Sequence, residues 1–207
     1  MRLRAWDLTI ERGGRRLFAG LSFELAEGAA LIVTGPNGSG KSSLLRALCG
    51  FLPIEGGGFA LEGGDAERTV GEQAHYLGHA DGVKGALTAG ENLAFSAAML
   101  GGDSSPPTQR AALARVGLAH AIDFPVRLLS AGQRRRVALA RLLVAERPLW
   151  LLDEPATALD AAAQGALTAI MQRRLQEGGI IVAAAHAPPG LDGAQELRLG
   201  ADAGAAA

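Results

Sequence analysis

The stretch Gly35-Pro36-Asn37-Gly38-Ser39-Gly40-Lys41-Ser42 decides the fold of this chain. An apolar run, Ala29 to Thr34, precedes it, and an apolar helical pattern, Lys41 to Cys49, follows it. A glycine-rich loop between a buried strand and a helix lets backbone N–H groups approach phosphate oxygens, and the helix start adds its positive dipole end. We therefore predict a phosphate-binding loop for a nucleoside triphosphate.

Two polar residues of this loop have separate expected roles. Lys41 should reach the β- and γ-phosphates and act in catalysis, and Ser42 should be a ligand of Mg²⁺. A chance glycine-rich turn is the alternative, and the strand before and the helix after the loop argue against it. The other expected nucleotide-binding residues of this stretch are Gly35, Pro36, Asn37, Gly38, Ser39, Gly40 and Ser43.

A second candidate segment is Leu149-Trp150-Leu151-Leu152-Asp153-Glu154-Pro155. Its acidic pair follows an apolar run and should lie at the carboxyl end of a buried strand, where ligands bind in open α/β sheets. We expect Asp153 to hold Mg²⁺ through water and Glu154 to polarise the attacking water as general base. A solvated loop after a core strand is the alternative, and the phosphate-binding loop upstream favours the catalytic interpretation.

A third segment, Leu129-Ser130-Ala131-Gly132-Gln133, opens a helix that we expect over Ala131 to Ala145. Its free amides and the Ser130 hydroxyl make a second anion site. In isolation an ordinary capped helix would be the simpler interpretation. Its position about 20 residues before the acidic pair favours a functional one.

Strand patterns alternate with helical patterns along most of the chain, which predicts an α/β fold with a mostly parallel sheet. Glycine-rich residues Ile54 to Asp65 suit a small antiparallel β subdomain. Helical spacing within about residues 78–128 predicts a helical subdomain inserted into the α/β core. We expect these parts to form one domain over residues 1–207.

Composition limits the classes of partner. Lys and Arg number 20 against 21 for Asp and Glu, so no basic excess indicates direct binding to nucleic acid. The run Arg134-Arg135-Arg136 is more often a helix end or a partner contact than a nucleic acid site. No apolar run approaches the roughly 18 to 20 residues that span a bilayer, so membrane association would need a partner.

Taken in order, these segments resemble the nucleotide-binding subunit of ATP-binding-cassette (ABC) transporters over about residues 3–190. The resemblance implies a P-loop NTPase core that binds and hydrolyses ATP with Mg²⁺. It also implies a homodimer in which Ser130, Gly132 and Gln133 complete the site of the opposite subunit. Ala131 stands where the family usually has the first of two glycines.

Two further positions match this family. Asp160, in Ala158-Leu159-Asp160, matches the loop that crosses the dimer interface, so it too is expected to act in trans. His186 matches the histidine that senses the γ-phosphate and is an expected catalytic residue.

Two positions depart from the family pattern. Arg12 falls where an aromatic side chain usually stacks on adenine, and a guanidinium can also lie over a π-face. Arg12 therefore either replaces the aromatic or leaves adenine loosely held. His79 takes the place of the usual glutamine that links Mg²⁺ and the attacking water to the transporter, so we expect it in coupling.

One branch of the family is similar in more detail, namely the ATP-binding subunits of haem exporters used in cytochrome c maturation. The similarity is carried by Tyr76-Leu77-Gly78-His79, by Leu87 to Leu93 and by the helix that opens at Ser130. It implies an ATPase that energises haem export or delivery for c-type cytochromes. Its partners would be integral membrane subunits, which it would bind peripherally at the cytoplasmic face of the bacterial inner membrane.

Two alternatives stay open at this point. The same ATPase could serve another exporter substrate, since the catalytic motifs do not contact the cargo. The second alternative is a soluble ABC ATPase that works on DNA or ribosomes. Such proteins usually carry tandem cassettes or coiled-coil insertions, which this chain lacks.

Overall fold

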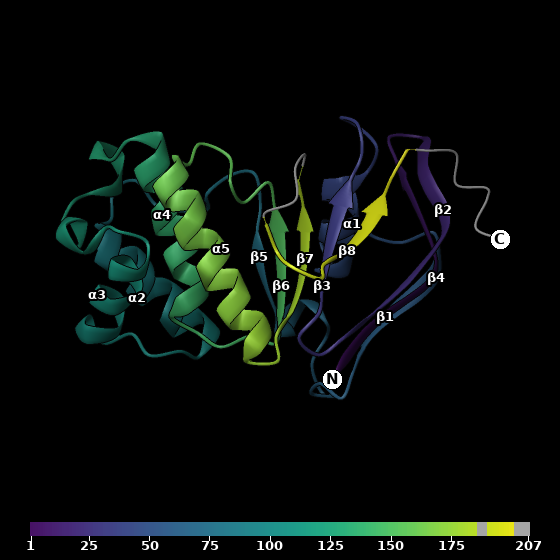
Figure 1. The fold of residues 1–207 in the computed structure, drawn as a ribbon, viewed down its shortest axis with the longest axis horizontal. Helices are drawn as coiled ribbons and strands as arrows, with labels where there is room; N and C mark the ends of the chain where they lie inside the picture. The colour runs from purple at the N-terminus through teal and green to yellow at the C-terminus, as the bar shows by residue number, and fades with distance from the viewer. Residues whose placement is uncertain (186–189, 201–207) are drawn as a thin grey trace. The chain divides into compact units, whose positions relative to one another are not determined.

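The computed structural model describes residues 1–185 and 190–200, and the chain divides into two compact units (Figure 1). The first unit contains residues 1–76 and 147–154 and the chain from Gln172 onward. The second contains Leu77–Glu146 and Pro155–Met171. That residues 1–207 act as one domain stays a prediction.

A five-stranded sheet forms the centre of the first unit. Its strand order is β5 (Ala74–Leu77), β6 (Leu149–Asp153), β7 (Ile180–Ala184), β3 (Ala30–Thr34) and β8 (Gln195–Arg198). The pairs β6–β7, β7–β3 and β3–β8 are parallel. Every residue of β6 and of β7 is buried, as expected for strands covered on both faces. The predicted parallel sheet is confirmed.

A second sheet in this unit is antiparallel and has three strands, in the order β2 (Arg15–Ala26), β1 (Arg2–Arg12) and β4 (Gly56–Glu62). β1 and β2 form a hairpin whose two turn residues, Gly13 and Gly14, both have positive φ, which a type I′ turn requires.

One apolar core joins this sheet to the parallel one. Its fully buried members include Leu3 and Ile10 of β1 and Leu44, Leu45 and Leu48 of helix α1 (Lys41–Leu48). The three leucines lie on one face of α1 because their spacing matches the helical repeat. The core therefore holds α1, and with it the loop before α1, against the sheet.

The second unit is helical. It contains α2 (Ala89–Leu100), α3 (Pro106–Arg115), α4 (Ala131–Ala140) and α5 (Ala161–Gln176) as far as Met171. α2 begins at a capping box in which the Thr88 hydroxyl and the Glu91 carboxylate accept each other's backbone N–H. The helix expected to reach Ala145 ends instead at Ala140, and a 3₁₀ turn, Arg141–Leu143, continues it.

Among the helices in the described part of the chain, none is both long and apolar enough to cross a membrane.

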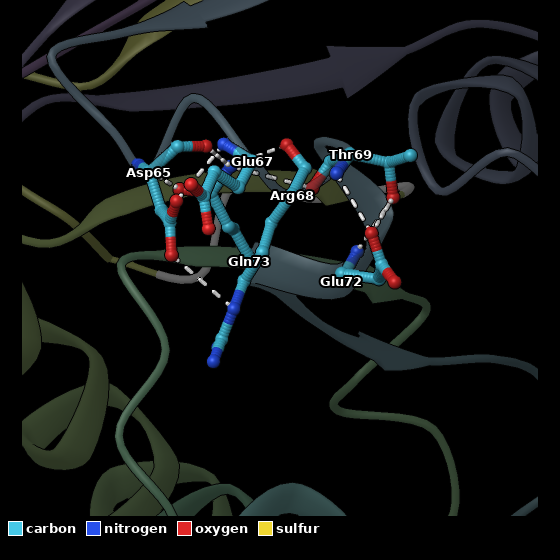
Figure 2. A network of polar contacts seen from close by, with 6 residues as sticks. All are labelled: Asp65, Glu67, Arg68, Thr69, Glu72 and Gln73. Atoms are coloured by element: carbon cyan, nitrogen blue, oxygen red, sulfur yellow. Dashed lines mark hydrogen bonds and ion pairs between the residues drawn. The ribbon is translucent and has the colours of Figure 1, made fainter.

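The loop between β4 and β5 is folded around one buried side chain, Gln73 (Figure 2). Its Oε1 accepts from Asp65 N at 2.7 Å, and its Nε2 donates to the carbonyl oxygens of Asp65, Arg68 and Thr69 at 3.0, 3.1 and 3.3 Å. A second contact, from Thr69 N to Glu72 Oε2, closes the adjacent turn at 2.7 Å. One amide thus satisfies four backbone groups of a loop that has little apolar packing of its own.

We predict that Gln73→Glu lowers the free energy of unfolding by about 2 kcal/mol, because a carboxylate cannot donate to the three carbonyl groups. Urea denaturation measures the change. Glu67→Gln is the control, because Glu67 lies in the same loop and its side chain is exposed. It should change the free energy of unfolding by less than about 0.5 kcal/mol. Equal stabilities of the two variants would contradict the organising role of Gln73.

Candidate functional site

The glycine-rich loop runs from the end of β3 to the first turn of α1. Gly35, Gly38 and Gly40 have φ values of 137°, 80° and 105°, a region that residues with a Cβ rarely adopt. Gly40 is the N-cap of α1, and no side chain caps the backbone amides there. Those amides are therefore available to an anion.

Space as well as backbone conformation requires glycine in this loop. A Cβ on Gly35 would lie 2.4 Å from the carbonyl oxygen of Leu199, just after β8. A Cβ on Gly40 would lie 3.0 Å from Cε1 of Phe18, a buried residue of β2. The loop is therefore packed against backbone on one side and an aromatic ring on the other.

The Lys41 side chain turns back over the loop. It is only 8% exposed, and its Nζ donates to the carbonyl oxygens of Gly35 at 2.7 Å and Pro36 at 3.3 Å. An ammonium group has three donor hydrogens, so Lys41 Nζ can exchange a carbonyl oxygen for a phosphate oxygen.

Ser42 and Asp153 meet although they are far apart in the sequence. Ser42 Oγ donates to Asp153 Oδ1 at 3.0 Å, and Asp153 is only 4% exposed at the end of β6. A hydroxyl and a carboxylate are both hard oxygen ligands of the kind that Mg²⁺ binds beside phosphates. The donor set at this point therefore fits Mg²⁺.

Ser39 provides a further observation within the loop. Its Oγ is buried and has no hydrogen-bond partner among the residues that the structure describes. Buried hydroxyl groups are normally satisfied. A hydroxyl left unsatisfied in a loop of free amides is consistent with a site completed by a polyanion.

Glu154 follows Asp153 with an uncommon backbone conformation. Its φ is 47°, which is rare for a residue other than glycine, and its N–H donates to the carbonyl oxygen of Ala184 at 2.9 Å. This bond fixes the residue to the end of the neighbouring strand β7. Such outliers are concentrated at functional sites, where the surrounding structure maintains them.

The Ser130 segment lies in the second unit and starts α4. Ser130 Oγ accepts from Gln133 N at 3.2 Å, and Gln133 Oε1 accepts from Ser130 N at 2.9 Å, which forms a capping box. A Cβ on Gly132 would lie 2.8 Å from the carbonyl oxygen of Ala158, so Gly132 permits a close backbone approach.

The remaining predicted residues lie apart from these groups in the chain. Asp160 directly precedes α5, and its Oδ1 accepts from Ala163 N of the first turn at 2.8 Å. His79 is exposed just after β5, and Arg12 is exposed at the hairpin between β1 and β2. His186 lies outside the described residues.

The sequence interpretation missed the role of Arg135. It grouped this residue with its two basic neighbours, yet Arg135 is buried in α4 and bonded to two other segments of the second unit. The helical period alone does not single out Arg135, because residues 137–140 are all buried and each of the three arginines has buried residues three and four positions later.

Comparison with known proteins adds to this geometry. The family model described as ABC transporter matches residues 18–157. The cytochrome c biogenesis ATP-binding export protein CcmA of Nitrobacter winogradskyi is 54% identical over 200 residues, which cover 97% of this chain and 98% of the relative. The protein of the same name from Bradyrhizobium diazoefficiens is 54% identical over 189 residues, 91% of this chain and 93% of the relative.

Two solved structures have a similar fold. A putative ABC transporter ATP-binding protein from Pyrococcus furiosus has a TM-score of 0.85 at 22% identity and covers 96% of this chain and 98% of that one. A bacterial Atm1-family ABC exporter with ATP bound has a TM-score of 0.80 at 24% identity, over 96% of this chain and 36% of that one. The predicted α/β P-loop fold is confirmed.

We predict that Lys41→Ala lowers ATP turnover by about 100-fold or more and weakens triphosphate binding, because the loop loses its only ammonium group. Phosphate release and binding of a fluorescent ATP analogue measure the two effects. Lys84→Ala removes the chain's other lysine, which lies over the ring of Phe95, and should leave both nearly unchanged. Similar losses in the two variants would contradict the assignment of Lys41.

Proposed function

The chain belongs to the ABC transporter family, as its motifs predicted, and on that premise we propose that it is the ATP-hydrolysing subunit of an exporter for cytochrome c biogenesis. The observation that carries the proposal is similarity along nearly the whole chain to proteins named for that role. The contact of Ser42 with Asp153 supports the ATPase part from geometry alone.

In the proposed reaction the glycine-rich loop binds the triphosphate of ATP through its backbone amides. Lys41 exchanges its contacts with the carbonyl oxygens of Gly35 and Pro36 for the β- and γ-phosphates. Ser42 and Asp153 would hold Mg²⁺, which when bound neutralises charge that develops on the phosphate oxygens. Asn37, Ser39 and Ser43 complete the surroundings of the phosphates.

Glu154 is the proposed general base. It directly follows the proposed Mg²⁺ residue, and the bond from its N–H to Ala184 fixes its backbone. In this position its carboxylate takes a proton from the attacking water as the water oxygen bonds to the γ-phosphorus. The bond from that phosphorus to the oxygen shared with the β-phosphate breaks, and ADP leaves with that oxygen. His186 is proposed to contact the γ-phosphate from the segment after β7.

We propose that the second half of each nucleotide site comes from another copy of the chain. Ser130, Gly132 and Gln133 would contact the γ-phosphate in trans, because Ser130 is exposed at the start of α4 and its hydroxyl, an acceptor in the capping box, still has a hydrogen to donate. Asp160 would lie at the same interface. The functional unit is then a homodimer that holds two ATP molecules.

Two residues of the proposed site differ from the usual family pattern, and we propose a role for each. Arg12, on an exposed hairpin tip, is proposed to lie over the adenine ring as a cation. Phe18 of strand β2 lies beside Gly40 of the phosphate-binding loop. The hairpin that carries Arg12 therefore starts next to the proposed phosphate site. His79 is proposed to relay the state of the nucleotide to the membrane partner.

The proposed partners are integral membrane subunits, and the proposed location is the cytoplasmic face of the bacterial inner membrane. The proposed cargo is haem for c-type cytochromes. Relatives that carry the name of an ATP-binding export protein of cytochrome c biogenesis support this choice over other exporter cargoes.

Glu154→Gln tests the mechanism. We predict that hydrolysis falls by about 100-fold or more while ATP binding persists, so that the variant accumulates as an ATP-bound dimer. Light scattering after size exclusion with Mg·ATP measures the dimer. Glu177→Gln, on an exposed carboxylate paired with Arg173, is the control. Turnover of Glu154→Gln at the native rate would refute the assignment of the base.

A genetic test addresses the cargo. We predict that deleting the gene in its host abolishes c-type cytochromes, measured by haem staining of membrane proteins after electrophoresis. A plasmid copy of the wild type or of Lys84→Ala should restore them, and Lys41→Ala should not. Normal cytochromes in the deletion strain, or isolation of the protein with membrane subunits unrelated to haem handling, would assign the ATPase to another cargo.

A further inference from the structure

A buried arginine lies five residues after Ser130 on α4. Arg135 is 3% exposed, whereas Arg134 and Arg136 on either side are only partly buried. A guanidinium that is removed from water requires partners for its charge and its donors. The partners of Arg135 therefore show what the residue holds in place.

Arg135 connects α4 to two other segments of the second unit. Its Nη1 donates to the carbonyl oxygen of Gly78 at 2.9 Å and to Asp81 Oδ1 at 3.2 Å. Its Nε donates to the carbonyl oxygen of Pro155 at 3.4 Å. Gly78 and Asp81 flank His79 in a segment that we name the His79 turn, Gly78–Gly82.

A second arginine holds the same turn. Arg141 Nη1 donates to the carbonyl oxygens of Asp81 and Gly82, both at 3.0 Å, and its Nε donates to Ser96 Oγ at 3.0 Å. Gly82 has a φ of 64°, and a Cβ there would lie 2.9 Å from Arg141 Nη1. Glycine at this position therefore allows the guanidinium to approach.

The chain just beyond the turn is also fixed. Asn92 Oδ1 accepts from Lys84 N at 2.7 Å, and its Nδ2 donates to the carbonyl oxygens of Lys84 and Thr88 at 3.0 and 2.9 Å. The backbone on both sides of His79 is thus bonded to helices of the second unit, while the His79 side chain itself is exposed.

From these contacts we infer that Arg135 is a positioning residue, which fixes the His79 turn and Pro155 to the helix that begins at Ser130. The inference rests on the proposed roles of Ser130 and His79. Pro155 directly follows Glu154 in the chain, so one side chain connects segments that carry or adjoin three of the proposed functional residues. A change in the turn is then transmitted to α4 through directed hydrogen bonds.

The side-chain chemistry separates this role from simple filling of space. Arg135 uses donors on two different nitrogens, and its Nη1 bonds a backbone carbonyl and a carboxylate. Lysine keeps the positive charge, but its three donors lie on a single nitrogen, so it cannot reproduce bonds that Arg135 makes from the separate nitrogens Nε and Nη1.

The test uses the full chain with Arg135→Lys and, on the partner side, Asp81→Asn. We expect kcat for ATP hydrolysis to fall about 10- to 100-fold in Arg135→Lys, with KM changed less than about threefold, because the reacting groups are misplaced and the phosphate-binding loop is intact. Backbone amides of residues 78–88 should exchange hydrogen faster, and those of β6 should not.

Asp81→Asn should give a smaller loss of kcat in the same direction, and the double variant should lose less than the product of the two single losses, because the two residues share one contact. If Arg135→Lys fails to fold, Asp81→Asn carries the test alone, since Asp81 is partly exposed and asparagine keeps its shape. Arg136→Lys, on the same helix with one 3.5 Å bond to the Val116 carbonyl, is the matched control.

Three results would overturn the inference. These are an unchanged kcat in Arg135→Lys or in Asp81→Asn, equal losses in Arg135→Lys and Arg136→Lys, or unchanged exchange in residues 78–88. Failure of the proposed function gives a different pattern, in which Lys41→Ala and Glu154→Gln also retain native turnover. The proposed function and the inference are both supported if kcat falls in Lys41→Ala, Glu154→Gln, Arg135→Lys and Asp81→Asn and stays near the native value in Arg136→Lys.

Discussion

Three parallel strands, β6, β7 and β3, end at one edge of a buried sheet, and the candidate site depends on this constraint. Ser42 and Asp153 are 111 residues apart in sequence, yet they share a hydrogen bond because β3, which leads through the loop to Ser42, and β6, which ends with Asp153, both end at that edge. The bond from Glu154 to the end of β7 has the same cause. The buried apolar strands thus fix where the candidate site lies, and the polar residues just after the strands are the groups proposed to bind and react.

The sequence predicted the strands that lead into the site, because Ala30–Thr34 and Leu149–Asp153 are apolar runs ended by glycine or acidic residues. It did not predict β8, Gln195–Arg198, since a polar strand at a sheet edge lacks both the apolar run and a clear alternation. Residue identity at the loop and the acidic pair was enough to predict roles, and those roles stay predictions. The contacts of Arg135 required coordinates, because the sequence does not fix which arginine of a basic run faces inward.

Both units have a buried apolar interior, and the second unit adds directed hydrogen bonds around the His79 turn. In the first unit, leucine and isoleucine side chains of β1 and α1 pack through apolar contacts that are not directional. In the second, Arg135 and Arg141 bond backbone carbonyls of the His79 turn, and Asn92 bonds the carbonyl of Lys84 just beyond it. Apolar packing suits a fixed phosphate-binding loop, whereas hydrogen-bonded connections can exist in a few discrete arrangements.

The backbone contact between Leu199 and Gly35 constrains how this protein can diverge. The carbonyl group of Leu199, and not its side chain, occupies the space beside Gly35, while the side chain is buried in the apolar core. An inserted or deleted residue within β8 would move the Leu199 carbonyl group away from Gly35 and place the carbonyl group of a neighbouring residue there. The contact with Gly35 thus constrains the length of β8 more directly than the identity of its exposed side chains.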